Sequence, residues 1–254
     1  MKKIALAFGF LLTILSMAPA QRVCVQASPT WSWMKTTDKL IEGSGSNWGL
    51  KFGVIGEFPV GFGDNRNDDE KKIALMLGLN LAFNHGGTLL NGYPQGIFWP
   101  NTDLSSPLLD TLPKDVKLHY RVTYLEIPFG LRLKTNPISR MGDTDMRIYF
   151  EVPFTAGFRL KSVGDIRGNT PIETEDEDIR KEVNGLAFSW GFGAGFEFDM
   201  PSNGAIVAGV QFQQQLTDMT DDGGSVYDSR DSSWKKEKSK GYFNAIALRL
   251  AYFF

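Results

Sequence analysis

Few residues in this chain of 254 could do catalytic chemistry, and they are scattered. Histidine occurs only at His85 and His119, and cysteine only at Cys24. Two histidines without cysteine partners make a poor metal site, and no nucleophile motif accompanies them. The sequence therefore predicts no catalytic residue, no metal ligand and no cofactor. A lipid-modifying enzyme that uses a histidine at a membrane rim is kept as an alternative.

A glycine-rich run at residues 191–195, with the sequence GFGAG, resembles a nucleotide-binding loop only superficially. No helical pattern follows the run, and its glycines share one face of an alternating segment, so phosphate binding is not expected. Glycines on one face of a strand instead leave room for a bulky neighbour. We expect Tyr124 or Tyr149 to lie across them.

Charged side chains are the more informative group, because they fall on the polar phase of segments that alternate apolar and polar residues. Nine of them are predicted to form a charge network in an enclosed interior: Lys51, Glu57, Glu126, Arg132, Arg147, Glu151, Arg159, Glu197 and Arg249. Unpaired charges in a narrow, enclosed space would be very costly. The prediction is an ion-pair network that plugs the interior. The alternative is a small porin-like pore whose path opens when pairs exchange.

The elements that must position these charges are strands, because every second residue is apolar over unusually long segments. Seven such segments cover residues 48–62, 71–84, 116–134, 146–161, 186–199, 205–217 and 242–254. The residues around Trp31 and Trp33 suggest an eighth, and single-chain bacterial barrels favour an even count. The fold predicted is all-β, an eight-stranded antiparallel up-and-down transmembrane β-barrel.

The apolar phase is predicted to face lipid. The interior of an eight-stranded barrel is too narrow for rows of phenylalanine, which argues against a soluble barrel with an apolar inside. Short connections are expected at residues 63–70, 135–144 and 200–204, and long ones at 36–46, 85–115, 164–182 and 218–240. This alternation predicts short periplasmic turns and long extracellular loops. The loop at 85–115, which holds Phe98 and Trp99, could cover the barrel mouth or bind a partner.

One segment breaks the phase. Within residues 116–134 the apolar positions are Val116, Leu118, Tyr120 and Val122 at first, but odd-numbered residues from Leu125 onward. Two interpretations are open: a bulge near Val122, or a strand end that rises clear of the bilayer.

The N-terminus resembles an export signal. Lys2 and Lys3 precede an apolar run that ends in a small-residue cleavage site at residues 18–20, so residues 1–20 are predicted to be a cleaved signal peptide and 21–254 the barrel. A net charge of −2 gives no reason to expect a nucleic-acid partner. The predicted location is the outer membrane of a Gram-negative cell.

The run Tyr124, Leu125, Glu126, Ile127 and Pro128 resembles the central motif of the PorT-type outer-membrane barrels of Bacteroidetes, where it opens the fourth strand. The resemblance implies an eight-stranded outer-membrane barrel, and the family's namesake takes part in type IX protein secretion. The terminal Leu250, Tyr252 and Phe254 resemble the signal that barrel-assembly machinery recognises.

The function expected from the sequence is therefore a non-enzymatic accessory, structural or interaction component of the outer membrane. Its expected partners are outer-membrane lipid and lipopolysaccharide, the barrel-assembly machinery and, by resemblance, secretion-system proteins.

Overall fold

A computed structural model describes residues 22–60, 73–142, 144–201 and 204–254. The predicted signal peptide at residues 1–20 lies outside the described residues. The elements are β1 (Arg22–Thr36), β2 (Ile41–Pro59), β3 (Ile73–Asn91), β4 (Gln95–Ile97), η1 (Pro107–Leu109), β5 (Leu112–Pro113), β6 (Val116–Lys134), β7 (Ser139–Met141), β8 (Thr144–Gly168), β9 (Thr174–Glu177), η2 (Arg180–Glu182), β10 (Leu186–Asp199), β11 (Ala205–Gln215), β12 (Ser225–Asp228), β13 (Ser233–Lys236) and β14 (Gly241–Phe253).

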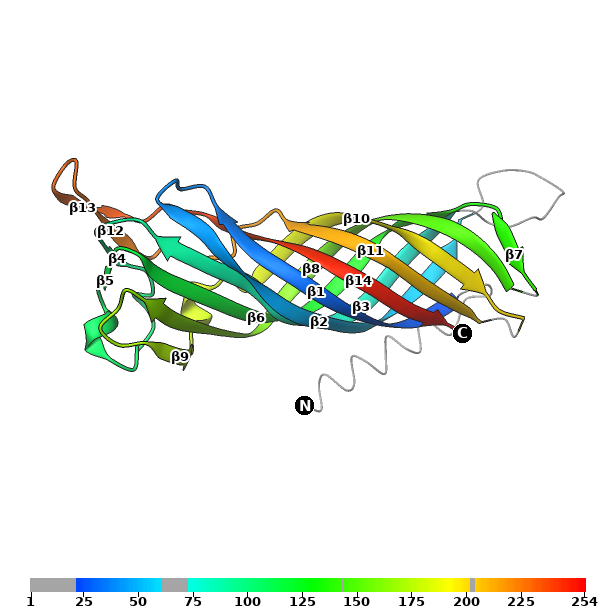
Figure 1. Ribbon diagram of the computed structural model, residues 1–254, viewed down its shortest axis with the longest axis horizontal. Helices are drawn as coiled ribbons and strands as arrows, with labels where there is room; N and C mark the ends of the chain where they lie inside the picture. Colours follow the sequence, from blue (N-terminus) through cyan, green and yellow to red (C-terminus); the bar gives the residue numbers. More distant parts are fainter. Residues whose placement is uncertain (1–21, 61–72, 143, 202–203) are drawn as a thin grey trace.

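Eight long strands close into one antiparallel ring (Figure 1). The order around the ring is β1, β2, β3, β6, β8, β10, β11 and β14, and β14 pairs with β1 to close it. The short strands β7 and β9 pair with β8, while β4, β5, β12 and β13 form a separate small sheet. In the described part of the chain no helix is long and apolar enough to span a membrane. The predicted all-β, eight-stranded barrel is confirmed.

The observed strand boundaries agree best with the predicted ones where apolar and polar residues alternate most regularly. The strands β6 and β10 begin and end at the predicted residues. The long connection expected at residues 36–46 is wrong, because β1 continues to Thr36 and β2 begins at Ile41. Residues 37–40 form only a short turn, since Met34 and Ile41 are buried in the barrel interior and hold both strands in the sheet. The connection predicted from residue 85 begins after Asn91 for the same reason.

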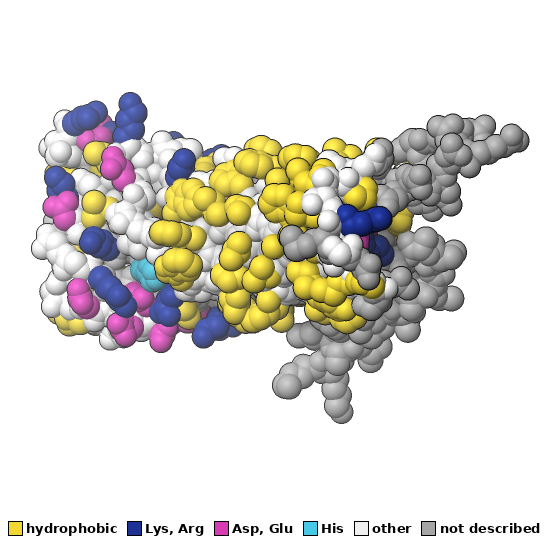
Figure 2. Space-filling model, turned by 45° about the vertical axis from the view of Figure 1, so that its right-hand side comes forward, with side chains coloured by type: hydrophobic (Ala, Val, Ile, Leu, Met, Phe, Trp, Pro, Cys, Tyr) yellow, Lys and Arg dark blue, Asp and Glu magenta, His cyan; other side chains and the backbone are white. Residues whose placement is uncertain are grey.

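On the face seen in Figure 2, a hydrophobic band crosses the middle of the barrel, and charged side chains gather at one end. The band consists of the outward apolar residues that alternation predicted, including Phe52, Leu77, Phe129, Phe192 and Leu248, all more than 40% exposed. Such an apolar band is the surface that a bilayer covers. We call this band the belt. It places the protein in the outer membrane, with the long loops outside the cell.

Above the belt the barrel wall reverses its polarity. In β3 the register shifts between Ala82 and His85, and Asn84 between them has a φ of 60°. In β8 the register shifts between Arg159 and Lys161, leaving Leu160 without an opposite residue. A one-residue shift moves every later side chain to the other face.

In β6, by contrast, even-numbered residues face inward throughout, so Val116, Leu118, Tyr120 and Val122 are buried in the interior. Of the two interpretations of this segment, the strand end that rises clear of the bilayer is therefore correct. The bulges lie in the two neighbouring strands and not at Val122.

Candidate functional site

The inner half of the lumen contains a network of buried charges. Its lowest layer joins β2, β6 and β10: Arg132 forms ion pairs with Glu57 and, at 3.3 Å, with Glu197. The ammonium group of Lys134 lies 2.7 Å from Glu57 and 3.0 Å from Glu197. Arg132 is completely buried, and the other three side chains are at most 9% exposed. Both carboxylates thus contact Arg132 and Lys134 across the barrel.

Two further ion pairs lie higher in the lumen. Arg249 on β14 pairs with Glu151 on β8, and Lys51 on β2 pairs with Glu126 on β6 at 2.7 Å. Gln213 joins the second pair, accepting from Lys51 at 2.8 Å and donating to Glu126 at 3.1 Å. Every buried carboxylate of this network therefore has a buried cation within ion-pair distance.

Tyr149 packs between the two arginines. The guanidinium carbon of Arg132 lies 4.0 Å from the centre of its ring, and that of Arg249 lies 5.9 Å away. A Cβ atom at Gly195 or Gly209 would collide with this ring, so these glycines make room for Tyr149, as predicted for Gly195. Arginines stacked on an aromatic face keep their edges free for carboxylates.

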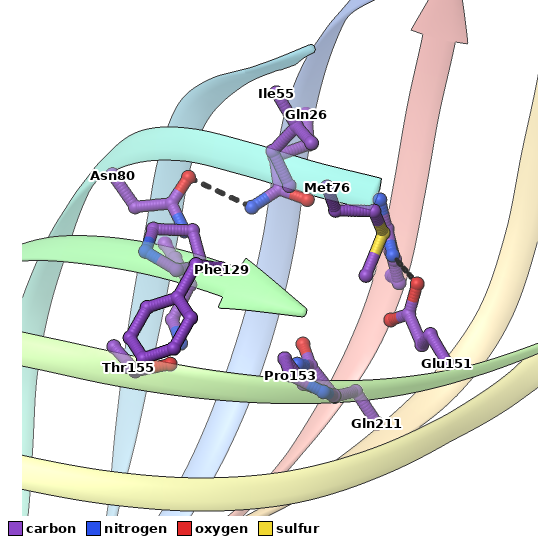
Figure 3. A pocket seen from close by; sticks show the side chains of 12 residues that line it. Gln26, Ile55, Met76, Asn80, Phe129, Glu151, Pro153, Thr155 and Gln211 are labelled. Atoms are coloured by element: carbon purple, nitrogen blue, oxygen red, sulfur yellow. Dashed lines mark hydrogen bonds and ion pairs between the residues drawn. The ribbon is translucent and has the colours of Figure 1, made fainter. Parts of the chain in front are cut away.

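Little space remains at this level of the lumen. Figure 3 shows Gln26 and Asn80 hydrogen-bonded at 2.9 Å across the interior, with Glu151, Thr155 and Gln211 also turned inward. The cavity that these side chains leave has a volume of about 10 Å³. A volume of that size holds about one water molecule.

The outer half of the lumen is filled by an apolar cluster. Trp99, from the long connection between β3 and β6, is 4% exposed and packs edge-on against Tyr120 at 5.6 Å between ring centres. Its indole nitrogen donates to the Tyr120 hydroxyl at 2.9 Å. Ile166 and Ile179 are completely buried in the same cluster. The loop with Trp99 thus contributes this side chain to the apolar cluster at the barrel mouth.

A buried carboxylate fixes this loop in place. Glu182 of η2 accepts hydrogen bonds from the backbone nitrogen of Asn101 at 2.6 Å and from the Thr102 hydroxyl at 3.1 Å. In this extracellular region, burial raises the pKa of Glu182 above its ordinary value, and the hydrogen bonds partly offset that effect. The carboxylate is a structural anchor between two connections.

The structure brings together seven of the nine predicted interior charges. Arg147 lies at the periplasmic rim, where it pairs with Asp199 at 2.6 Å. It joins the network only indirectly, because Arg22 contacts both Asp199, at 3.4 Å, and Glu197. Arg159 lies apart from the network, because it follows the last inward residues of the charged layer and sits beside the Leu160 bulge. Its guanidinium donates instead to the backbone oxygens of Arg180 and Val183.

Sequence reasoning missed Lys134 and Arg22 as members of the network. Lys134 has the same parity as Arg132, which is a sufficient signal for an inward side chain. Arg22 lies at the first described residue of β1, outside the segments in which alternation predicts a strand, and it contacts Glu197 at 2.5 Å.

The two histidines lie on different sides of the barrel wall. His85 is completely buried and packs edge-on against Phe243, with 5.2 Å between ring centres. His119 lies on the outward phase of β6, where its Nδ1 is 2.8 Å from the Thr88 hydroxyl. Among the described residues no cluster of three or more His, Cys, Asp or Glu could hold a metal ion.

The motif at residues 124–128 lies in the middle of β6 and does not open the strand, which begins at Val116. Tyr124, Glu126 and Pro128 face inward, while Leu125 and Ile127 lie on the outward phase. At the C-terminus, Leu250, Tyr252 and Phe254 are exposed on the outer face of the barrel.

Together, the closed ring, the belt and the charged lumen define the class of protein: this chain is an integral outer-membrane β-barrel. No family model matches the sequence, and no curated protein matches it. Several solved outer-membrane proteins resemble its fold.

Neisserial surface protein A is 11% identical over 91% of this chain and 95% of its own, with a TM-score of 0.35. The attachment invasion locus protein Ail of Yersinia pestis is 10% identical over 92% and 99%, with a TM-score of 0.34. A major outer membrane protein from Thermus thermophilus is 11% identical over 93% and 100%, with a TM-score of 0.38. Function here must therefore be argued from the residues of this chain.

Proposed function

We propose that this protein is a non-enzymatic outer-membrane barrel with a plugged lumen, which acts as a structural or interaction component through its extracellular end. The observation that carries the proposal is the filling of the lumen by two stacked layers, a buried ion-pair network below and an apolar cluster above. In this proposal neither layer leaves a continuous path for a solute.

The ion pairs argue against a small pore. To open the lumen, Arg132 or Arg249 would have to leave its carboxylate, and breaking a buried ion pair typically costs about 3–5 kcal/mol. Trp99 and the residues packed around it would then also have to leave the barrel mouth. A pore would need both changes at once, which makes the closed form the functional form in this proposal.

The elaborated surface of the protein is its extracellular end, which we call the head: the small sheet of β4, β5, β12 and β13, the strand β9, the turns η1 and η2, and their connections. Figure 1 places these elements together at one end of the barrel, opposite the C-terminus. A closed barrel that carries a folded head is suited to hold a protein partner at the cell surface.

A finer proposal is that this component belongs to a secretion assembly of the PorT type. Its support is the motif Tyr124 to Pro128, in which Glu126 takes part in the Lys51 ion pair and Tyr124 is buried beside Phe243. In this proposal lipopolysaccharide surrounds the belt, and the exposed C-terminal residues Leu250, Tyr252 and Phe254 guide insertion by the barrel-assembly machinery.

Electrical recording in planar bilayers tests the plug. The purified protein is expected to show no steady, discrete channels, whereas an Arg249→Ala/Trp99→Ala variant, which weakens both layers, is expected to leak. Steady channels in the wild type at the conductance of the variant would overturn the proposal. Folding of both proteins is checked by the mobility shift between unheated and heated gel samples.

Co-purification from native membranes in mild detergent, after crosslinking, tests the interaction role. A partner protein is expected in stoichiometric amount with the wild type, and less of it with a variant that carries Trp234→Ala and Lys236→Ala on the exposed strand β13. Recovery of the barrel alone would contradict an interaction role. An altered acyl pattern of lipid A after deletion of the gene would favour the enzyme alternative instead.

A further inference from the structure

A basic pocket lies at the base of the head, between residues 101–103 and the turn η2. Its volume is about 540 Å³. It is lined by Asn101, Thr102, Asp103, Arg159, Asp178, Arg180 and Lys181. We call it the rim pocket. No step of the proposed function uses it.

The walls of the rim pocket are held by specific contacts. Glu182 fixes Asn101 and Thr102 on one side through the hydrogen bonds described above. Arg159 fixes the other side, since its guanidinium donates to the backbone oxygens of Arg180 and Val183. The cations of the pocket therefore stand on a fixed frame.

The charge of the rim pocket favours an anion. Asp178 is engaged by Arg180, with contacts of 2.6 and 2.9 Å between the guanidinium and the carboxylate. Neither Arg159 nor Lys181 has a carboxylate within ion-pair distance among the described residues. A guanidinium and an ammonium that share one pocket are a common arrangement for binding phosphate oxygens.

The position of the rim pocket identifies the kind of anion. Arg159 belongs to the inward phase of β8, since it pairs with Tyr124, and its guanidinium extends to the backbone of residues 180–183. Its chain neighbours Phe158 and Leu160 face outward as belt residues that are 41% and 47% exposed. Leu186, which pairs with Phe158 across the strands, is 52% exposed and completes the outer edge of the belt. The pocket thus lies at the level of the barrel where the exposed apolar residues of β8 and β10 end, which is the depth expected for lipid phosphate groups.

We propose that the rim pocket binds the phosphate group of an anionic lipid of the outer leaflet, with Arg159 and Lys181 as its ligands. The acyl chains of the same lipid lie along Phe158, Leu160 and Leu186. This assignment deepens one part of the proposed function, the lipopolysaccharide around the belt, and rests on that part. It does not depend on a protein partner, so failure of the lipid test and failure of the co-purification test are distinguishable.

A second pocket of the head supplies a matched control. Its volume is about 420 Å³, and Lys39, Arg230 and Lys238 line it together with Asp38 and Asp228. It therefore has the same balance of cations and carboxylates as the rim pocket. It lies at the turn between β1 and β2, well beyond the outermost belt residues of those strands, so lipid should not reach it.

Native mass spectrometry tests the assignment with the full protein extracted from phosphatidylcholine vesicles that contain lipid A. Wild-type protein is expected to retain lipid A in preference to phosphatidylcholine. An Arg159→Gln/Lys181→Gln variant is expected to lose about tenfold or more in affinity, because each charged hydrogen bond contributes about 1.5–3 kcal/mol. The control variant Arg230→Gln/Lys238→Gln, with the same loss of charge, is expected to match the wild type.

Equal loss of lipid A from the control variant would overturn the proposal, since it would show attraction by net charge alone. Retention by the rim variant would overturn it as well. Displacement of lipid A by millimolar inorganic phosphate would assign the pocket to free phosphate and overturn the lipid. Because Arg159 also supports the loop, Lys181→Gln alone is measured too, and it is expected to lose affinity while the head stays as resistant to protease as in the wild type.

Discussion

The inner and outer halves of the lumen are lined by opposite kinds of side chain. Within the belt, ion pairs such as Arg132 with Glu57 fill the interior, and apolar side chains cover the outside. Above the belt, Trp99 and Tyr120 fill the interior, and charged residues cover the outside. The same strands run through both halves. The solvent outside each half, lipid or water, determines which polarity the interior must have.

The transition between the halves needs only local changes of register. The bulges at Asn84 in β3 and Leu160 in β8 turn the apolar phase from the outside of the wall to the inside. In β6 the backbone phase is unchanged, and the sequence itself exchanges apolar and polar positions between Val122 and Leu125. A barrel can thus carry a soluble-protein core on top of a membrane-protein core within one closed sheet.

The largest effect should come from leaving one charge of the inner half unpaired. Arg249→Leu removes the partner of Glu151, and the free energy of unfolding should fall by about 3–5 kcal/mol. Urea unfolding of the barrel in vesicles, followed on unheated gels, measures it. The double variant Arg249→Leu/Glu151→Leu should recover most of the loss. Equal losses in the single and double variants would show that the pairing does not matter.

Truncating the apolar core of the outer half should have a smaller and more local effect. Trp99→Ala should destabilise the head by about 3 kcal/mol, because it leaves a cavity and removes a hydrogen bond to Tyr120. Limited proteolysis of the extracellular loops should speed up, while the unfolding of the barrel in urea should barely change. A matching loss in the barrel would mean that the two halves unfold together and that the comparison fails.

The pH dependence of the head distinguishes the two halves further. Burial raises the pKa of Glu182, of Glu237 and of Asp218, so protonation favours the folded head. Their stabilising contribution is complete below the unfolded values of about 4 and is lost as pH rises through the raised folded values. Loop proteolysis should therefore be slower at mildly acidic pH than at neutral pH. A Glu182→Gln variant should show less of this change, and an unchanged pH profile in that variant would exclude Glu182 as a cause.

The smallest effect should come from an exposed ion pair of the head. Lys235 contacts Asp228 at 2.8 Å, and both side chains are substantially exposed to water. Lys235→Ala should change the stability of the β12 and β13 hairpin by less than about 1 kcal/mol. Protease sensitivity of the hairpin is the measurement. A loss as large as that of Arg249→Leu would mean that burial does not set the strength of these pairs.

Alternation predicted the strands because lipid and lumen impose a period of two on every membrane-spanning residue. It predicted β6 and β10 completely, and it failed for β1 and β2 at the turn 37–40. There the wall stands in water, and glycines at 43 and 45 interrupt the apolar pattern. The hydrogen bonds of the sheet continue across such positions, although the side chains there no longer alternate between apolar and polar.

The sequence predicts which residues belong to the candidate site, but it does not predict which of them pair with one another. Parity along each strand identifies Glu57, Glu126 and Arg132 as inward side chains. Which cation meets which carboxylate depends on the stagger of strands that are distant in the sequence, and no single segment encodes it. The role of Trp99 was open for a similar reason. Whether a loop packs into the barrel or stays in water depends on the apolar residues that other strands place in the interior.

The length of β8 determines which part of the protein molecules in the medium can contact. Its 25 residues extend about 80 Å along the strand, which is roughly 60 Å of height at an ordinary barrel tilt of about 40°. The hydrocarbon layer that the belt spans is only about 25 Å thick. Much of the remaining height lifts the head clear of the hydrocarbon layer. Antibodies and other bulky molecules in the medium would therefore encounter the head, while the barrel below it stays shielded by lipid.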